Sequence, residues 1–524
     1  MSEEHMKPKG NLSTLATVLL LALLFNYYTY VNSEVSYRIA DSPDENLALI
    51  FSKLIAEDSS LIWHSEMNER YNVSYFRPRN SIDIGDNNYI GPYAGFQMLL
   101  ATARLYGLID HTVALTGCIG VLFLYLLVRN IFDERTAIIA ALLWGLNPSY
   151  VFFSNMYYSN IPAVTFSIIA LYCFHKGVQT EKITYIGCSG LFCLYAVFTR
   201  TSEIVIFASI LIGLLAARWG FTKKIQLKET VIFVSIFLVL RILWIASSSS
   251  LNAQTVDINT GGGGIGYQFG YLMDNIGFYG SSFMDYIISY PPLLFVLACF
   301  GVISIYSSKD KMQRFFTLFF IILFLLFFGL YGFRGETWGF ENVSIDSSMA
   351  RYFLINYAIL SIFASVFLVN FFKKQDHSRI VALFLLLILL TSTAMIFESD
   401  NNLIRAKDRL SSWSDLNRET VDVTPQNAVI FTRAFDKVFM LDRQVAVYRT
   451  EEELRAQPDM AYWYTPANME KDLIPLIDKM ISDGIPVYVT QEATELFQHL
   501  EKNNRYRMTP VTKNKMIWKI DKIS

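Results

Sequence analysis

The sequence predicts a polytopic α-helical membrane protein of about eleven transmembrane helices, followed by a small extracytoplasmic α/β domain. Three observations support this fold class. Long apolar stretches alternate with short polar gaps, Lys and Arg gather in every second gap, and the chain becomes polar after residue 397. Because short cytoplasmic loops of membrane proteins carry an excess of Lys and Arg, the alternation predicts an N-terminus inside and a C-terminus outside.

Composition agrees with this class and excludes others. Of the 524 residues, 53% are hydrophobic and only 17% are charged, whereas soluble domains have about 25% charged residues. The formal net charge of −2 argues against a nucleic-acid partner. The five cysteines lie in apolar stretches and form no disulfide framework or zinc-binding pattern.

The apolar stretches define the expected spans. A helix needs about 20 apolar residues to cross a bilayer, and the third to sixth stretches are shorter than that. Either their polar ends extend them or one pair is re-entrant. The first stretch follows Lys7 and Lys9 as a signal peptide would, but it ends in tyrosines without a cleavage site, so we expect a retained helix. The spans lie near residues 12–30, 110–128, 136–153, 160–174, 183–199, 202–217, 230–247, 290–306, 315–333, 352–371 and 380–397.

The membrane domain is expected to cover residues 1–397 and to carry two long outside loops, residues 31–109 and residues 248–289. In the first loop, Leu47, Ile50 and Phe51 recur at helical spacing. This spacing predicts an amphipathic helix lying in the membrane interface, and residues 96–108 form a second candidate.

The extracytoplasmic domain is expected to cover residues 398–524. Apolar runs with strand character alternate there with helical patterns, which is typical of a small α/β domain. Strands are predicted at 428–432, 444–448, 486–490 and 516–520, and helices at 467–481 and 492–500, where Pro475 is expected to kink the first helix.

An acidic cluster stands near the start of the first outside loop, in the run Asp41-Ser42-Pro43-Asp44-Glu45. Three carboxylates just past a membrane span are candidates for a general base at the water–lipid boundary. The same residues also match a helix start. Ser42 at the N-cap, Pro43 at the first helical position and Glu45 three residues after the cap form a capping box. The two interpretations are compatible, because a capped helix start is a rigid mount for a catalytic side chain.

Together with later segments, this cluster resembles the GT-C superfamily of membrane glycosyltransferases. Among its members, the dolichyl-phosphate-mannose protein mannosyltransferases and the bacterial aminoarabinose and lipopolysaccharide sugar transferases are most similar. The resemblance covers roughly residues 10–400. It rests on the order and membrane side of Pro43-Asp44-Glu45, Asn147-Pro148-Ser149-Tyr150, Tyr157-Tyr158-Ser159-Asn160-Ile161-Pro162-Ala163, Phe198-Thr199-Arg200-Thr201 and Ala350-Arg351-Tyr352-Phe353-Leu354.

The resemblance implies a reaction and its partners. A hexose-like or mannose-like sugar would move, with inversion, from a polyprenyl-phosphate-linked donor to a protein, lipid or glycan acceptor on the non-cytoplasmic face of the membrane. In a prokaryote that membrane is the plasma membrane. The resemblance implies that Asp44 is the general base, while Asp41 and Glu45 remain alternatives.

Arginines at the outer ends of spans are candidates for the donor phosphate, because a guanidinium can bind phosphate with two parallel hydrogen bonds. The candidates are Arg200 and Arg351, with Arg77 and Arg79 in the first loop. The alternative for Arg200 and Arg351 is that they extend to the lipid headgroups.

Asn160 and Tyr352 are candidates for binding the acceptor or the sugar. Many relatives carry a second acidic residue where this chain has Asn160, and an amide cannot hold a metal ion as a carboxylate does. We therefore predict that no metal and no other cofactor is needed.

Two other classes of protein remain as alternatives. A transporter or lipid flippase usually buries charges within its spans and often shows inverted repeats. Here the charges lie at span ends and no repeat is evident. An inactive scaffold that binds a partner through the C-terminal domain is the third possibility, and the departure at Asn160 keeps it open.

Overall fold

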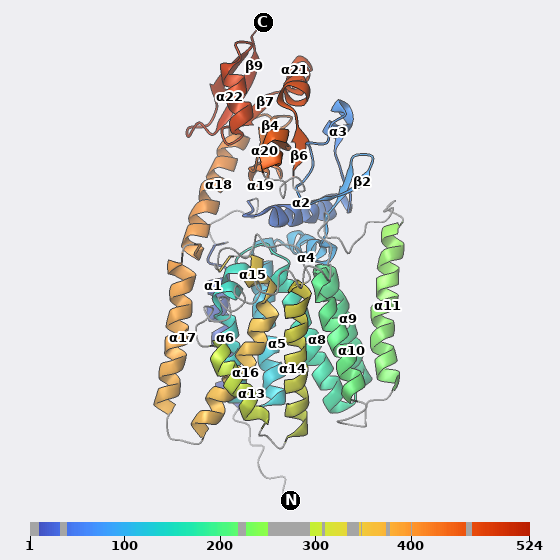
Figure 1. Cartoon of the computed structure of the whole chain (residues 1–524), viewed down its shortest axis with the longest axis vertical. Helices are drawn as coiled ribbons and strands as arrows, with labels where there is room; N and C mark the ends of the chain where they lie inside the picture. The colour runs from blue at the N-terminus through green and yellow to red at the C-terminus, as the bar shows by residue number, and fades with distance from the viewer. Residues whose placement is uncertain are drawn as a thin grey trace, which may run out of the picture. The chain divides into compact units, whose positions relative to one another are not determined.

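A computed structural model describes residues 10–31, 39–217, 227–249, 294–306, 310–332, 345–346, 348–373, 378–399, 401–456 and 464–523. The expected outside loop 248–289 lies outside the described residues except for its first two. The chain divides into two compact units (Figure 1). Among the described residues, unit 1 contains those within 10–31, 111–249 and 294–404, and unit 2 contains those within 39–110 and 405–523.

Unit 1 is helical, and a helix occurs at each of the predicted spans. Apolar side chains surround most of these helices, as expected for helices that face lipid or a buried bundle on every side. The helices are α1 (Gly10–Tyr28), α5 (Ile109–Ile131), α6 (Glu134–Gly145), α7 (Pro148–Ser154), α8 (Asn160–Thr180), α9 (Ile183–Thr199), α10 (Ile204–Ala216), α11 (Leu227–Ser249), α13 (Leu294–Tyr306), α14 (Lys311–Gly332), α15 (Ser348–Tyr352), α16 (Leu354–Lys373) and α17 (Ser378–Glu398).

Helix length and composition give a smaller count of spans than the charge pattern does. Within the part of the chain that the structure describes, four helical stretches are long and apolar enough to cross a membrane, or five if one bent pair counts as a span. Shorter apolar helices, such as α9, occupy other predicted spans. The structure therefore supports a multi-span helical protein, while the number eleven and the orientation stay predictions.

The bent pair is α6 and α7, which meet at an angle of 65°. Pro148 opens α7, and the side chain of Asn147 accepts hydrogen bonds from the backbone N–H groups of Ser149 and Tyr150. A proline at the first position and an Asn cap both favour a new helix start here. The third predicted span is therefore broken at the Asn147-Pro148 motif.

Close approach of helices depends on glycine at one point in unit 1. A Cβ atom at Gly301 in α13 would collide with the backbone carbonyl of Phe363 in α16. Only glycine permits such close packing, which is common where membrane helices pack on one another.

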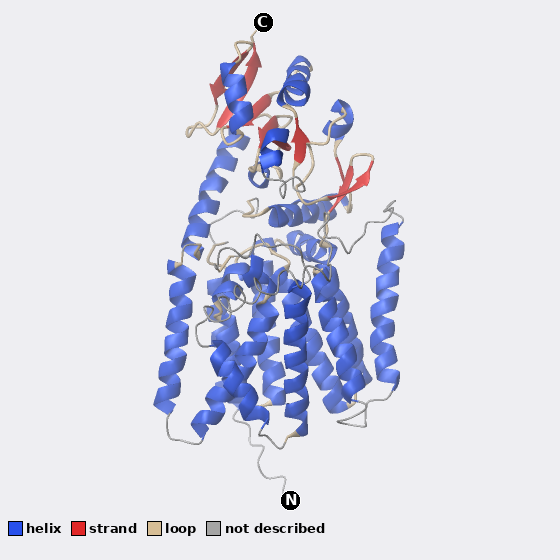
Figure 2. Cartoon of the chain, viewed as in Figure 1, coloured by secondary structure: helices blue, strands red, loops and turns tan. Residues whose placement is uncertain are grey.

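Unit 2 contains a six-stranded sheet in the order β6-β5-β4-β7-β9-β8 (Figure 2). Strands β4, β5, β6 and β7 run parallel, and β9 is antiparallel to β7 and β8. The predicted α/β character of the tail is confirmed. The strands are β4 (Val429–Thr432), β5 (Gln444–Thr450), β6 (Thr465–Ala467), β7 (Val487–Thr490), β8 (Tyr506–Pro510) and β9 (Ile517–Lys522).

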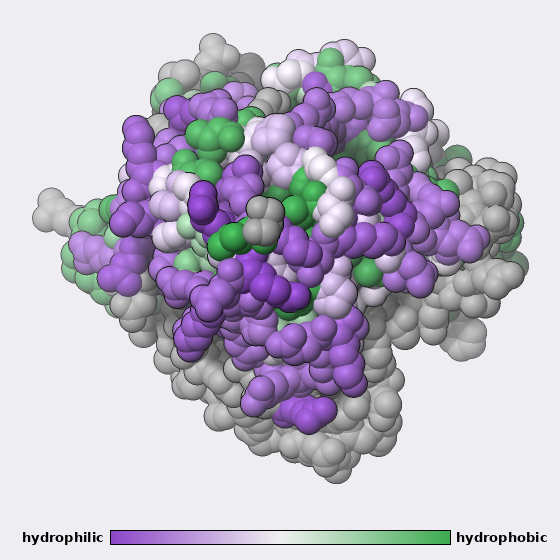
Figure 3. Space-filling model, turned by 90° about the horizontal axis from the view of Figure 1, so that it is seen from above, coloured by the Kyte–Doolittle hydropathy of each residue, from purple (hydrophilic) through white to green (hydrophobic). Residues whose placement is uncertain are grey.

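Helices cover this sheet, and the amphipathic helix α18 precedes it in the chain. Helix α21 starts at Ile474, directly after a π-helical turn, with Pro475 at its start, so the predicted helix 467–481 is divided next to its proline. The surface of unit 2 seen in Figure 3 is mainly hydrophilic. Helix α22 exposes Glu495, Gln498 and Glu501. The helices are α18 (Leu403–Val423), α19 (Asp436–Phe439), α20 (Glu451–Ala456), α21 (Ile474–Ser482) and α22 (Thr494–Lys502).

The first outside loop belongs to unit 2, which differs from the expected division at residue 397. Tyr71, Tyr75 and Phe76 are buried in the same apolar core as strands β4, β5 and β7. The backbone N–H of Val447 also donates to the carbonyl of Tyr75 at 3.0 Å. The loop supplies large apolar side chains to this core, and this explains why the two segments form one unit.

The first loop folds into helices and a small sheet. The elements are α2 (Pro43–Asp58), α3 (Glu66–Tyr71), α4 (Ala94–Leu105) and a sheet of β1 (Trp63–His64), β3 (Asn88–Ile90) and β2 (Ile82–Gly85). The apolar stripe of α2 is covered by protein, because Leu47, Ile50 and Phe51 pack against Met440 and Leu441. This burial differs from the expected contact of that stripe with the membrane interface.

Candidate functional site

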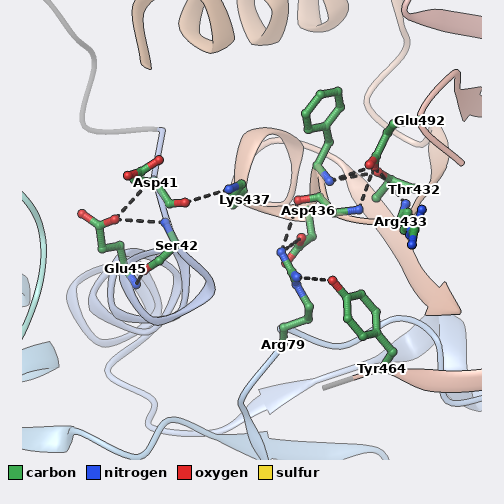
Figure 4. A network of polar contacts seen from close by, with 12 residues as sticks. Asp41, Ser42, Glu45, Arg79, Thr432, Arg433, Asp436, Lys437, Tyr464 and Glu492 are labelled. Atoms are coloured by element: carbon green, nitrogen blue, oxygen red, sulfur yellow. Dashed lines mark hydrogen bonds and ion pairs between the residues drawn. The ribbon is translucent and has the colours of Figure 1, made fainter. Parts of the chain in front are cut away.

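The acidic cluster forms the start of α2, and the predicted capping box is present. Ser42 has extended backbone angles, and its hydroxyl accepts a hydrogen bond from the Glu45 N–H at 3.3 Å. Glu45 reaches back, and its Oε2 accepts from the N–H groups of Asp41 and Ser42 at 2.9 and 3.0 Å (Figure 4). Glu45 is only 1% exposed, and its carboxylate stabilises the start of α2.

Asp41 is held by two cations of unit 2. Arg409 donates from Nε and Nη2 to the two carboxylate oxygens of Asp41, at 2.9 and 2.7 Å. Lys437 donates to the Asp41 backbone carbonyl at 2.7 Å. A bidentate Arg–carboxylate pair fixes both groups, so Asp41 anchors the helix start.

Asp44 lies in the first turn of α2 and is half-buried. Its Oδ1 accepts a hydrogen bond from the side-chain amide of Asn80 at 2.8 Å. Asn80 has a left-handed backbone with φ of 65°, a conformation that Asn tolerates better than most residues. Sequence reasoning did not single out Asn80, although it directly follows the proposed phosphate ligand Arg79.

The Arg79 side chain is hydrogen-bonded to residues within unit 2. It forms a buried ion pair with Asp436, through Nε at 2.9 Å and Nη2 at 2.6 Å, and it donates to the Tyr464 hydroxyl at 2.6 Å. Burial lowers the pKa of Arg79, but Asp436, Tyr464 and Glu492 raise it by more, so the guanidinium stays charged. Arg77, the other candidate in this loop, is half-buried.

The short helix α19 carries Asp436 and Lys437, and a carboxylate holds the turn before it. Glu492 Oε1 accepts from the backbone N–H groups of Arg433, Ala434 and Phe435, and from the hydroxyl of Thr432 (Figure 4). Successive N–H groups in a turn favour an anion, so Glu492 fixes this loop.

Lys437 is buried against an aromatic ring. Its ammonium lies 4.3 Å from the ring centroid of Trp413. Burial lowers the pKa of Lys437 from its ordinary value, and Asp41 partly opposes that effect. Segment 433–437 therefore contacts the first outside loop through an anion, Asp436, and a cation, Lys437.

Unit 1 brings together the two remaining arginines. The guanidinium of Arg200 lies 4.8 Å from the ring centroid of Tyr352, and that of Arg351 lies 5.4 Å from the same ring. Arg351 also lies 4.8 Å from the ring of Tyr158. Arg200 donates from Nε to the Ser202 hydroxyl at 3.0 Å and is 7% exposed. Aromatic faces attract and orient guanidinium groups.

Asn160 joins this cluster from the start of α8. Its amide nitrogen donates to the backbone carbonyl of Arg351 at 3.2 Å, and Asn160 is 4% exposed. Its Oδ1 is buried without a hydrogen-bond partner among the described residues. A buried acceptor of this kind can receive a hydrogen bond from a bound ligand.

The structure thus sorts the predicted residues into two groups. Asp41, Asp44, Glu45 and Arg79 lie in unit 2, and Arg200, Arg351, Asn160 and Tyr352 lie in unit 1. The residues that sequence reasoning missed are Asn80, Arg409, Asp436 and Lys437. Arg409, Asp436 and Lys437 lie more than 350 positions from their partners, and no local pattern marks them.

Comparison with known proteins gives a sequence match and several fold matches. Residues 109–244 match the family model described as dolichyl-phosphate-mannose-protein mannosyltransferase. No curated protein matches the chain in sequence. The apo structure of ArnT from Cupriavidus metallidurans has a TM-score of 0.63 at 12% identity, and the match covers 97% of this chain and 98% of that one. The fold is of the GT-C type.

Two further structures support the GT-C fold. ArnT from Cupriavidus metallidurans bound to undecaprenyl phosphate matches with a TM-score of 0.60 at 11% identity, over 97% of this chain and 98% of that one. The oligosaccharyltransferase AglB from Archaeoglobus fulgidus, in complex with an inhibitory peptide and a dolichol-phosphate, matches with a TM-score of 0.52 at 11% identity, over 91% and 70%. The resemblance predicted from the sequence motifs is confirmed.

Proposed function

We propose that this protein is an integral membrane glycosyltransferase that moves a sugar from a polyprenyl-phosphate-linked donor to an acceptor on the non-cytoplasmic face. The observation that carries the proposal is the GT-C fold over 97% of the chain, shared with a protein whose structure contains undecaprenyl phosphate. The family match over residues 109–244 supports the same class of donor. The proposed sugar is a hexose such as mannose.

The proposed reaction is a single displacement with inversion. The acceptor oxygen attacks the anomeric carbon while the bond between that carbon and the phosphate oxygen breaks, and the acceptor's proton passes to a carboxylate. Charge at the sugar becomes oxocarbenium-like, as in other glycosyl transfers. We assign the carboxylate to Asp44, because Asp41 is paired with Arg409 and Glu45 is buried in the cap.

The leaving polyprenyl phosphate gains negative charge and requires a fixed cation. We assign this task to Arg200 and Arg351, whose guanidinium groups both lie against the Tyr352 ring. Guanidinium groups held in place by aromatic rings lose little entropy when they bind an anion. Asn160, which contacts the backbone of Arg351, would orient the donor or acceptor through its buried carbonyl oxygen.

Binding of polyprenyl phosphate to detergent-purified protein tests the assignment of the arginines. Arg351→Ala and Arg200→Ala should each weaken binding by about tenfold or more, and Lys at either position should restore it only in part, because Lys lacks the planar fork. Arg129→Ala is the matched control, because Arg129 is exposed in the last turn of α5. If both Ala variants bind like the wild type, the phosphate site lies elsewhere.

A further inference from the structure

Loop 77–81, which carries Asn80, is bonded to helix α19 of the C-terminal α/β segment (residues 405–523). Asn80 donates a hydrogen bond to Asp44, so the contacts of this loop bear on the Asp44 carboxylate. Arg79 and Asp436 form an ion pair in which the side chains are 8% and 0% exposed. The Tyr464 hydroxyl and the Ala434 carbonyl accept two further hydrogen bonds from Arg79. The buried guanidinium therefore donates four hydrogen bonds, which hold the Arg79 side chain in place.

The neighbouring residue then acts on the carboxylate. Asn80 follows Arg79 directly, and its amide donates to Asp44 Oδ1 at 2.8 Å. The backbone N–H of Ser81 donates to the Pro78 carbonyl at 3.2 Å, which closes the turn around Asn80. The Asn80 amide therefore lies in a closed turn, one residue after the side chain that pairs with Asp436.

The other side of the helix start is fixed by the same C-terminal segment. Lys437 follows Asp436 and donates to the Asp41 carbonyl, and Arg409 binds the Asp41 carboxylate. Glu492 holds the turn that leads into α19. All of these groups belong to unit 2, so their geometry is internal to one compact body.

We propose that Asn80 is a positioning residue for Asp44, and that Arg79 and Asp436 act through it as a support built from the C-terminal segment. This inference rests on the proposed function of Asp44 as the base. A reacting carboxylate must be held within about 0.5 Å of its productive position, and a misplacement of about 1 Å can cost about 100-fold in rate. The C-terminal segment thus has a role in catalysis without touching substrate.

The test measures steady-state transfer by the full-length enzyme with a polyprenyl-phosphate sugar. Asn80→Gly removes the amide and keeps the backbone conformation, because glycine adopts positive φ without strain. We expect kcat to fall by about 10- to 100-fold, with the KM for the donor changed by less than about twofold. Asn80→Asp replaces the donor N–H by a carboxylate oxygen that repels the Asp44 carboxylate, so it should lower kcat at least as much as Asn80→Gly.

Asn87→Gly is the matched control. Asn87 has φ of 57° in the same unit and lies in the turn between β2 and β3, so it reports the effect of the same substitution away from Asp44. Its kcat should equal that of the wild type. If Asn80→Gly also keeps the wild-type kcat, the positioning role is refuted.

A double variant tests the support separately from folding. Arg79→Met with Asp436→Leu replaces the buried ion pair by apolar side chains, a change that often leaves stability intact. We expect a wild-type melting temperature and a kcat reduced to about that of Asn80→Gly. A folded double variant with wild-type kcat would overturn the proposed support.

Asp44→Asn, measured in parallel, separates this inference from the proposed function. If Asp44→Asn is active at the wild-type rate, the assignment of the base is wrong. If Asp44→Asn is inactive while Asn80→Gly and the double variant are fully active, the assignment of Asp44 as the base holds and only the positioning role of Asn80 is wrong.

Discussion

Glu45 and Asp44 are neighbouring carboxylates at the start of α2, where Glu45 caps the helix and Asp44 is the proposed base. Substitution of Glu45 should lower stability, and substitution of Asp44 should lower turnover. Glu45 Oε2 accepts from the N–H groups of Asp41 and Ser42, and Glu45 is 1% exposed. Glu45→Ala leaves both donors without this acceptor. Loss of a helix cap costs about 0.5–2 kcal/mol, and hydrogen bonds to an ionised acceptor are at the strong end. We therefore expect a loss of about 2 kcal/mol.

Glu45→Gln is the control for this loss. A single oxygen of Glu45 accepts both hydrogen bonds, and the Gln carbonyl oxygen can do the same, so most of the stability should return. Asp44→Asn should instead keep the melting temperature and lower turnover by about 10²–10⁴-fold, the usual contribution of a general base.

The assay combines thermal unfolding in detergent with turnover per folded molecule. The reasoning is refuted if Glu45→Ala unfolds at the wild-type temperature. It is also refuted if Asp44→Asn transfers sugar at the wild-type rate while Asp41→Asn is inactive, because the base would then lie three residues earlier.

Three further predictions concern topology, the buried pair and metal ions. A cysteine introduced at Ser412, which is exposed, should react with an impermeant thiol reagent on intact cells, whereas one at Lys224 should not; equal labelling would contradict the eleven-span topology. Asp436→Ala leaves the Arg79 charge buried alone and should cost about 3–5 kcal/mol, which the double replacement Arg79→Met with Asp436→Leu should largely restore in thermal unfolding. Transfer should continue at the wild-type rate in EDTA, because Asn160 offers an amide and not a carboxylate; inhibition that Mn²⁺ or Mg²⁺ reverses would show a metal requirement.

The fold followed from the sequence where the signal is local. Apolar stretches located the helices at the predicted spans of unit 1, whereas the short helix α15 and the break between α6 and α7 were missed. The Ser42–Glu45 spacing predicted the capping box because such a box depends on four consecutive residues. Strands β4, β5, β7 and β9 were found from apolar runs. The edge strands β6 and β8 were missed, since β6 has only three residues and β8 alternates weakly in burial.

The candidate site was only partly accessible from the sequence, because its supporting contacts join distant segments. Nothing near Arg79 in the chain indicates that Asp436, 357 positions later, neutralises it. Arg79 consequently looked like a phosphate ligand. The membership of the first loop in unit 2 was missed for the same reason, since Tyr75 and Phe76 show their burial only against the strands.

The measurement that tests the central claim most directly is the release of polyprenyl phosphate from lipid-linked sugars by the purified protein. A panel of mannosyl, glucosyl and aminoarabinosyl donors is incubated with wild type and Asp44→Asn, and sugar and lipid are followed together. The account predicts that wild type releases polyprenyl phosphate from at least one donor, in step with sugar transfer, and that Asp44→Asn binds the donor without releasing it. Intact donor throughout, with folded protein that moves the lipid-linked sugar across reconstituted vesicles, would contradict the account and identify a flippase.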